Sequence, residues 1–332
     1  MRIVSVCRGY PTHRPGGMLF VCQDRAEALA DSRHHVHVLT TGTSNGPEES
    51  SPKGLTLHHL NCEPLKYSRE FANECLSLVK KINPDIIHLD SFDRNNPWFV
   101  DCGYRTAITM HGFGWGSVLT DWNLGRANPI DFNALRLEQR CLSKADVVIG
   151  VSRHEHWLLR DTYQIHQAKL VYNPIPDYFF QCVTDLLPDD GYFMCASVSG
   201  GDVRGHNLVC DAAKQLGQQV KVCTNIPRRE LPKLYDGCKA FVLPTAFGQG
   251  ADLAVCEAIA RRRPVIVTAT GSYFRESEPG GFLDGCCVLL KNRSPSSIME
   301  AMSGILPCVS SCRSDRFRPE FHANAWLEAV DA

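Results

Sequence analysis

Two stretches in the first half of the sequence hold residues of the types that bind phosphates and sugars. His111 follows the apolar run Ala107–Met110 and opens the segment His-Gly-Phe-Gly-Trp-Gly. A histidine at a strand end beside glycines and aromatic rings suits a loop that contacts a polar ligand, although a lone histidine more often has a structural role. The pair Gly16-Gly17 precedes an amphipathic segment. Small residues at a helix start let an anion reach backbone N–H groups, and an ordinary loop is the alternative.

Two charged residues in the second half could bind the same kind of ligand. Arg204 precedes Gly205 and a segment with helical periodicity, and a cation there can meet a diphosphate. A solvated surface arginine is the alternative. Glu257 lies in the otherwise apolar segment Leu253–Ala260, where a carboxylate needs a partner because an unpaired buried charge is costly. A ribose diol or a salt bridge to one of Arg261–Arg263 would satisfy it, and the residues alone do not decide between them.

These residues stand among short apolar runs that alternate with amphipathic segments. Such alternation predicts βαβ units and parallel sheets with helices on both faces. Ligands of these sheets bind beyond the carboxyl ends of the strands, where His111 and Arg204 are expected to lie. The expected helices include Leu19–Ala30, Arg69–Lys81, Leu253–Ala260 and Phe321–Val330. The expected strands are Arg2–Val6, Val36–Leu39, Leu55–His59, Asp85–Leu89, Ala107–Met110, Val147–Val151, Leu170–Tyr172, Tyr192–Val198, Val220–Cys223, Ala240–Leu243, Pro264–Thr268 and Cys287–Leu290.

The length of 332 residues predicts two domains. Pro174 and Pro176 mark the break between them, because prolines disfavour helix interiors and central strands. The expected parts are a doubly wound domain at residues 1–172, a linker at 173–188, a second doubly wound domain at 189–315, and a C-terminal helix at 316–332 that could pack back on the first domain.

Composition excludes several classes of protein. Lys and Arg number 35 and Asp and Glu number 36, so the formal net charge is −1 and gives no strong nucleic-acid signal. An apolar content of 44% excludes a disordered chain. The 16 cysteines are scattered through apolar runs, which predicts reduced core thiols and a cytoplasmic protein. No apolar run approaches the roughly 20 residues that span a bilayer, and peripheral membrane contact stays open.

The order of the motifs resembles the retaining glycosyltransferases of glycosyltransferase family 4. The segments that carry the resemblance are Tyr10-Pro11, Gly16-Gly17, Asp85–His88, Thr109–Gly112, Ala145–Ser152, Val171–Pro174, Arg204-Gly205, Phe241–Thr245, Glu257–Ala260 and Pro264–Val267. The resemblance implies the α/β fold called GT-B, in which two Rossmann-like doubly wound domains face each other across a cleft. It places the acceptor on the N-terminal domain and a nucleotide-sugar, most often a UDP- or GDP-sugar, on the C-terminal domain.

The resemblance also implies roles for particular residues. His111 and Arg204 are the implied catalytic residues, His111 at the donor sugar and Arg204 at the diphosphate, where cations stabilise the charge of the leaving group. Glu257 is implied to hold the ribose hydroxyls. The other implied donor-binding residues are Gly16, Gly17, Ser199, Gln249, Asp252 and Leu253, and the implied acceptor-side residues are Tyr10, Trp115 and Asp121. Neither a metal nor a cofactor is implied. The acceptor stays open among a glycan, a lipid, a small metabolite and a modified nucleobase.

Two positions depart from the family pattern. Ser199 stands where the family commonly has a second cation, and Gln249 stands where it has a second glutamate. These departures motivate an alternative, a non-catalytic GT-B protein that binds sugars or acts as a scaffold. Arg8, Arg14, Arg228 and Arg229 are the candidates to replace the missing cation. A nicotinamide-dependent dehydrogenase is the third hypothesis, and the sequence lacks its Gly-x-Gly-x-x-Gly fingerprint.

Overall fold

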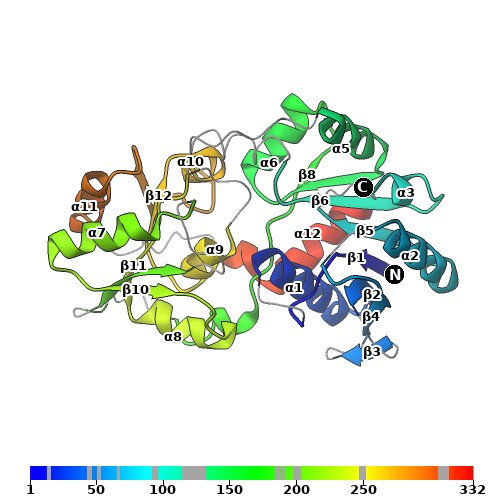
Figure 1. The fold of residues 1–332 in the computed structure, drawn as a ribbon, viewed down its shortest axis with the longest axis horizontal. Coiled ribbons are helices and arrows are strands. Elements are labelled where there is room, and N and C mark those ends of the chain that lie inside the picture. The colour runs from blue at the N-terminus through cyan, green and yellow to red at the C-terminus, as the bar shows by residue number, and fades with distance from the viewer. Residues whose placement is uncertain are drawn as a thin grey trace. The chain divides into compact units, whose positions relative to one another are not determined.

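The computed structural model describes residues 1–12, 16–42, 47–50, 54–65, 68–91, 96–113, 132–183, 188, 191–196, 203–246, 252–305 and 314–331. These residues form two compact units, whose elements are labelled in Figure 1. Unit 1 combines the described residues up to 113 with residues 132–174 and 319–331. Unit 2 consists of the described residues from 175 to 318.

Unit 1 is built on a sheet of eight described strands. They are β1 (Arg2–Val6), β2 (His35–Gly42), β3 (Pro47–Ser50), β4 (Leu55–Asn61), β5 (Ile86–Asp90), β6 (Thr106–Met110), β7 (Val147–Gly150) and β8 (Lys169–Leu170). Their order is β3-β4-β2-β1-β5-β6-β7-β8. All neighbours are parallel except β3 and β4. Strands β5 and β6 are buried along their whole length, as parallel strands covered on both faces should be.

Unit 1 has six described helices. They are α1 (Gly17–Asp31), α2 (Arg69–Ile82), α3 (Asn96–Val100), α5 (Phe132–Lys144), α6 (Arg153–Trp157), which continues as one π-helical turn (Leu158–Thr162), and α12 (Pro319–Asp331). Helix α2 shows how the sequence sets both ends. The Ser68 hydroxyl accepts a hydrogen bond from the Phe71 N–H at 3.1 Å, and Asn83 takes a left-handed φ of 50° that ends the helix.

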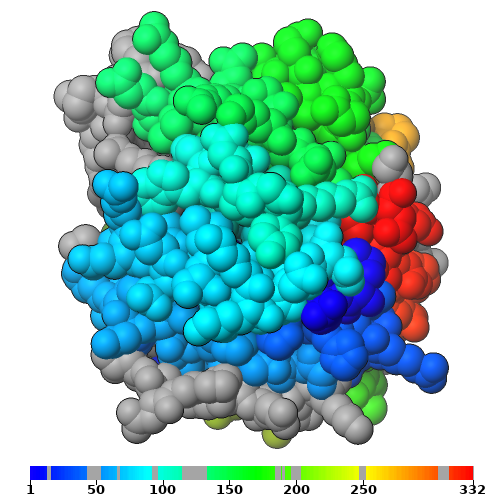
Figure 2. All heavy atoms as spheres, turned by 90° about the vertical axis from the view of Figure 1, so that its right-hand side faces the viewer, coloured from blue at the N-terminus to red at the C-terminus, as the bar shows by residue number. Residues whose placement is uncertain are grey.

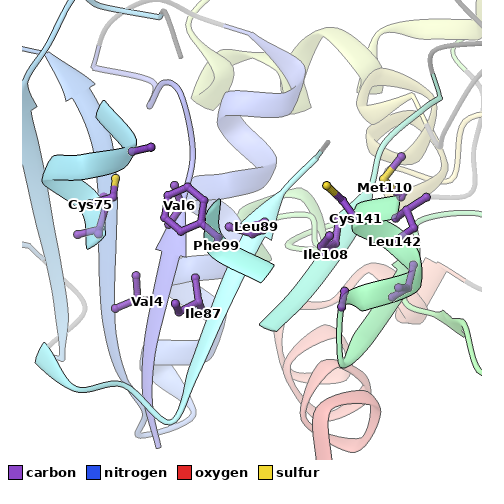
Figure 3. Close-up of a cluster of buried hydrophobic side chains, with 14 of the residues drawn as sticks. Val4, Val6, Cys75, Ile87, Leu89, Phe99, Ile108, Met110, Cys141 and Leu142 are labelled. Carbon is purple, nitrogen blue, oxygen red and sulfur yellow. The ribbon is translucent and has the colours of Figure 1, made fainter. Parts of the chain in front are cut away.

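A buried hydrophobic cluster of unit 1 holds the sheet against its helices (Figure 3). Strand residues such as Val6 and Leu89 pack near Phe99 of α3, as the close-up shows. Ile108 of β6 packs in the same cluster with residues of α5. This packing fixes β5 and β6, the two strands whose carboxyl ends lead into Asp90 and His111.

The C-terminal helix α12 packs on unit 1. Ala323, Trp326 and Val330 share a buried cluster with residues of β1, β2 and α1. Helix α12 contacts α1 directly. In Figure 2 the red C-terminal segment lies beside the dark-blue N-terminal residues. The two ends of the chain therefore contribute to one core.

Unit 2 is built on a sheet of five described strands, all parallel. They are β9 (Tyr192–Ala196), β10 (Val220–Cys223), β11 (Cys238–Leu243), β12 (Val265–Thr268) and β13 (Cys287–Leu290), in the order β10-β9-β11-β12-β13. The helices are α7 (His206–Leu216), α8 (Leu231–Asp236), α9 (Leu253–Ala260), α10 (Gly271–Ser277) and α11 (Pro295–Ser303). Single 3-10 turns lie at Asp177–Phe179, Arg228–Glu230 and Ser314–Phe317.

The strands and helices expected from the sequence are confirmed within the described residues, with differences at their ends. The largest disagreement in overlap is at Leu170–Tyr172, which shares only Leu170 with β8. Strand β3 was not expected. Its sequence, Pro-Glu-Glu-Ser, has no alternation of apolar and polar residues. It pairs only with β4 at the edge of the sheet, where proline and charged residues are tolerated.

The cysteines agree with the expectation at most described positions. Thirteen of them are free, and most of these are buried in apolar surroundings. Cys286 is disulfide-bonded, so the prediction of uniformly reduced thiols is wrong at this residue. Sequence spacing could not reveal it, because a disulfide depends on two Cβ atoms approaching within about 4 Å in the folded chain. In the part of the chain that the structure describes, no helix is long and apolar enough to cross a membrane.

Candidate active site

The sheet of unit 2 has its topological switch point between β9 and β11. The chain leaves β9 for β10 on one side of it and then crosses to β11 on the other. Ligands of open α/β sheets bind at the carboxyl ends of two such strands. The two loops that follow these strands touch, because the Ala246 N–H donates to the Val203 carbonyl at 2.8 Å. Arg204 stands in this place.

Gly205 sets the close approach of the two loops. Its φ is +70°, and a Cβ placed on it would lie 2.7 Å from the carbonyl oxygen of Pro244. Only glycine fits such a position without strain. Arg293 holds the same carbonyl, because its Nε donates to the Pro244 oxygen at 2.7 Å. The backbone that carries Arg204 is therefore fixed from two sides.

The Arg204 guanidinium is paired with a carboxylate of the same unit. Its Nη1 donates to Oδ1 of Asp252, the residue before α9, and the Tyr273 hydroxyl donates to Oδ2. The pKa of Arg204 is raised by the neighbouring Asp252 charge, and burial with the same charge raises that of Tyr273. The Arg204 side chain is 31% exposed and that of Asp252 is 15% exposed, so an anion in solvent can reach the pair.

Glu257 points into unit 2 from α9 and is buried. Its Oε1 accepts from Arg228 Nε at 2.8 Å, and its Oε2 accepts from the Tyr235 hydroxyl at 3.3 Å. The Arg228 guanidinium also lies over the Phe179 ring, 5.7 Å from the ring centroid. Burial raises the pKa of Glu257, and the Arg228 charge partly offsets that rise.

A salt bridge of Glu257 was expected to involve one of Arg261–Arg263, and this expectation is wrong. The partner is Arg228, which lies 29 residues away in sequence, and not one of Arg261–Arg263. Arg261 instead binds Asp236, with Nη2 at 2.7 Å from Oδ1, and carbonyl oxygens of the 179–182 segment. The arginines directly after α9 were the closest cations in sequence, but the Glu257 side chain meets Arg228 in the 3-10 turn at Arg228–Glu230.

In unit 1 the switch point lies between β1 and β5. The chain passes from β1 to β2 and β4 on one side and then crosses to β5 on the other. Asp90 is the last residue of β5, and His111 directly follows the neighbouring strand β6. Gly16 is the residue before α1 and has an extended backbone, and Gly17 is the first residue of α1, where a Cβ would meet nothing within 4 Å.

Asp90 is the centre of a buried polar network that the sequence did not predict. It accepts hydrogen bonds from Arg25 Nη1 and from Ser5 Oγ, the latter at 3.1 Å. His111 Nε2 lies 3.6 Å from its Oδ1, and His88 Nδ1 lies 3.7 Å from its Oδ2. The Arg25 charge holds the pKa of Asp90 well below its usual range, against the effect of burial. Asp90 is therefore an ionised carboxylate directly behind His111.

Helix α12 reaches into this network. Arg25 Nε donates to His322 Nε2 at 3.3 Å, and His322 Nδ1 donates to the Tyr172 carbonyl at 2.7 Å. The Trp326 ring packs edge-on against His88, with ring centroids 5.5 Å apart. The sequence carries only weak signals of this network: Asp90 ends an apolar run, and Arg25 lies near apolar residues of α1.

The buried histidines predict a loss of stability in acid. Burial lowers the pKa of His88 and of His322 to about 3, from 6.5 in an exposed side chain. Between these values the unfolded chain binds protons that the native protein does not, so stability falls as the pH falls below about 6.5. Each histidine should cost about 1.4 kcal/mol between about pH 7.5 and 5.5. Urea denaturation at the two pH values measures the loss.

The variant His322→Gln supplies the control for this prediction. Glutamine cannot take up a proton in this range but can still accept from Arg25 and donate to Tyr172. Below about pH 6.5, unfolding of this variant should take up about one proton fewer than unfolding of the wild type, so its free energy of unfolding should fall less steeply as the pH falls. An unchanged pH dependence would show that His322 is not a buried neutral histidine.

Some of the remaining expected site residues lie in the described part of the structure, and the others lie outside it. Tyr10 is buried in unit 1, where burial raises its pKa, so its ring forms part of the core. Leu253 is the first residue of α9, directly after Asp252. Arg229 lies over the Tyr178 ring, 5.4 Å from its centroid, and Arg8 is exposed after β1. The positions outside the described residues are Arg14, Trp115, Asp121, Ser199 and Gln249.

The described site residues form two clusters, and the members of each cluster lie far apart in the sequence. In unit 2 the structure brings together Arg204, Asp252 and Tyr273, and it places Glu257 further along the same helix α9. In unit 1 it brings together His111 and Asp90. Among the described residues, no group of three or more His, Cys, Asp or Glu side chains could hold a metal ion. The prediction of a metal-independent protein stays a prediction.

Comparisons with known proteins identify the domains. Residues 15–177 match the family model Glycosyltransferase Family 4, and residues 176–308 match the model Glycosyl transferases group 1. No curated protein sequence matches this chain significantly. The two matches together cover most of the sequence, so the chain carries two glycosyltransferase domains.

Solved structures show the fold. Sucrose-phosphate synthase from Thermosynechococcus elongatus is 19% identical, with a TM-score of 0.74 and coverage of 99% of this chain and 94% of that chain. The catalytic domain of starch synthase IV from Arabidopsis thaliana, bound to ADP and acarbose, is 12% identical, with a TM-score of 0.65 and coverage of 100% and 99%. HepE from Anabaena, in complex with UDP and glucose, is 14% identical, with a TM-score of 0.62 and coverage of 100% and 95%. The expected GT-B fold with two Rossmann-like domains is confirmed.

Proposed function

We propose that this chain, with its two glycosyltransferase domains, is a retaining glycosyltransferase of family 4 that transfers a sugar from a nucleotide-sugar to an acceptor. The observation that carries the proposal is the position of Arg204. It is a partly exposed cation at the switch point of the sheet in unit 2, the place where open α/β sheets bind ligands. Solved structures with this fold hold UDP, UDP-glucose and ADP, which supports a nucleoside diphosphate at this place.

The chemistry proposed for Arg204 follows from the charge that the reaction develops. As the bond between the sugar and the diphosphate breaks, the diphosphate gains negative charge. A fixed guanidinium beside it stabilises that charge more in the transition state than in the ground state. His111 is assigned to the donor sugar, with Asp90 behind it at 3.6 Å. The acceptor then attacks from the face that the diphosphate leaves, which retains the configuration.

The donor-binding role of Glu257 has to be compatible with the partners that it already has in unit 2. One carboxylate oxygen accepts a hydrogen bond from Arg228 and the other accepts one from Tyr235. A carboxylate has about four acceptor sites, so ribose hydroxyls can be added to these bonds or can replace one of them. We assign UDP- or GDP-sugars as donors, and we leave the acceptor open among a glycan, a lipid, a small metabolite and a modified nucleobase.

A second candidate function is a non-catalytic GT-B protein that binds sugars or acts as a scaffold. A specific observation favours it. Arg204 and Glu257, the two charges assigned to the donor, are both neutralised by partners inside the protein. A protein whose donor-binding charges are satisfied internally can keep the fold without turning over a donor.

The test is the release of nucleoside diphosphate from a panel of UDP-, GDP- and ADP-sugars. The proposal expects turnover of at least one donor, with kcat/KM lower by about 100-fold in Arg204→Gln. Arg160→Gln is the matched control, because Arg160 is exposed on the π-helical turn of unit 1, and it should keep wild-type activity. Donor binding without release would favour the non-catalytic candidate. Release that is equal in wild type and Arg204→Gln would contradict the role of Arg204.

A further inference from the structure

Asp252 does not do what an acidic residue before a helix usually does. Aspartate at this position normally accepts hydrogen bonds from backbone N–H groups of the first helical turn. The Asp252 side chain makes no such bond to α9. Its two oxygens instead accept from the guanidinium of Arg204 and the hydroxyl of Tyr273. The carboxylate is therefore held toward the switch point of the sheet and away from its own helix.

The Asp252 carboxylate therefore lies at the place where the proposed function puts the negatively charged diphosphate. A carboxylate and a phosphate can each present two oxygen atoms that accept paired hydrogen bonds from a guanidinium. Asp252 already accepts a hydrogen bond from one N–H group of the Arg204 guanidinium. A diphosphate that approached Arg204 would meet the Asp252 charge at short range, and the two anions repel each other. Tyr273 is buried and fixes the second oxygen, so Asp252 is not a freely swinging side chain.

We propose that Asp252 is a built-in competitor for the diphosphate, an internal anion that pairs with Arg204 and that a nucleoside diphosphate must displace. This inference rests on the proposed function, because it assumes that Arg204 binds the diphosphate. Asp252 then sets how tightly the site holds both the donor and the nucleoside diphosphate product. An internal competitor weakens product binding as well as donor binding, which favours release of the product after transfer.

The probes that test this are inorganic pyrophosphate and UDP, with affinities measured by isothermal titration calorimetry. Pyrophosphate carries the phosphates without ribose or base, so it reports on Arg204 and Asp252 without Glu257. Asp252→Asn removes the charge and keeps the size of the side chain, and asparagine is as favourable as aspartate at the position before a helix. We expect it to bind both probes about tenfold more tightly than the wild type. Asp252→Ser, a second neutral residue of this kind, should shift the affinity in the same direction.

Two further variants make the test specific. Asp211→Asn makes the same change of charge at an exposed position on α7 and should leave both affinities unchanged. In the Arg204→Gln background, Asp252→Asn should have a smaller effect than in the wild type, because the competition for the guanidinium is then absent and only the repulsion between Asp252 and the phosphates remains. Thermal denaturation followed by circular dichroism establishes that each variant is folded.

The outcomes separate this inference from the proposed function. UDP that binds the wild type and Asp252→Asn equally well overturns the competitor and leaves the glycosyltransferase intact. Binding that tightens as much in the Arg204→Gln background as in the wild type also overturns it, since the effect would then not act through Arg204. If neither the wild type nor Asp252→Asn binds UDP or pyrophosphate, both the competitor and the proposed donor site are wrong.

Discussion

Replacing Asp90 with asparagine is expected to lower the free energy of unfolding by about 3–5 kcal/mol. The variant keeps the shape of the side chain but leaves the Arg25 guanidinium buried without its counter-charge, and Arg25 is only 2% exposed. Removing one partner of a buried pair costs this much because the remaining charge cannot regain its hydration. Urea denaturation followed by circular dichroism at neutral pH measures the loss.

Two further variants show whether the loss comes from the buried charge. Asp161→Asn makes the same chemical change at an exposed position of unit 1 and should stay within about 0.5 kcal/mol of the wild type. The double variant Arg25→Met with Asp90→Leu removes both charges and should recover a large part of the stability lost in Asp90→Asn. An Asp90→Asn protein as stable as Asp161→Asn would show that the Arg25–Asp90 pair does not hold unit 1 together.

Replacing Glu257 with glutamine is expected to lower the free energy of unfolding by about 3 kcal/mol and also to weaken binding of the nucleotide. The stability loss follows from the Arg228–Glu257 pair, whose side chains are 8% and 4% exposed. Glutamine can still accept a hydrogen bond from Tyr235, but it cannot neutralise the buried guanidinium. The affinity loss follows from the proposed contact with the ribose, where a neutral amide oxygen is a weaker acceptor than a carboxylate.

The two effects of Glu257→Gln are measured separately. Urea denaturation gives the stability, and titration with UDP under conditions where the variant is fully folded gives the affinity. Glu230→Gln, at an exposed position beside Arg228, is the matched control and should change neither. Pyrophosphate should bind Glu257→Gln and the wild type alike, because it has no ribose. A loss of stability with unchanged UDP affinity would make Glu257 a structural residue only.

The fold could be predicted from the sequence because its signals are local and repeated. Apolar β-branched runs such as Ile86–Asp90 and Val265–Thr268 are buried in the sheets, and the helices between them follow from their periodicity and their caps. The edge strand Pro47–Ser50 was missed for the same reason, since an edge strand can form without apolar alternation. His111 and Arg204 lie beyond the carboxyl ends of strands, as expected, and their roles at a ligand stay predictions.

The partners of the charged residues could not be predicted in the same way. Arg25 and Asp90 are 65 residues apart, and Arg204 and Asp252 are 48 apart. Such pairs depend on which loops and helices meet in three dimensions, and a buried charge in the sequence shows only that some partner must exist. The expected partner of Glu257 was wrong for this reason. The role of α12 in the network behind His111 was likewise beyond the reach of local patterns.

The central claim is that unit 2 binds a nucleoside diphosphate through Arg204, and a crystal structure of the protein soaked with UDP tests it most directly. We predict diphosphate oxygens within hydrogen-bond distance of the Arg204 guanidinium, Asp252 turned away from it, and ribose hydroxyls at Glu257. A nucleotide bound at any other place, with the pairs of Arg204 to Asp252 and of Glu257 to Arg228 both intact, would contradict the account.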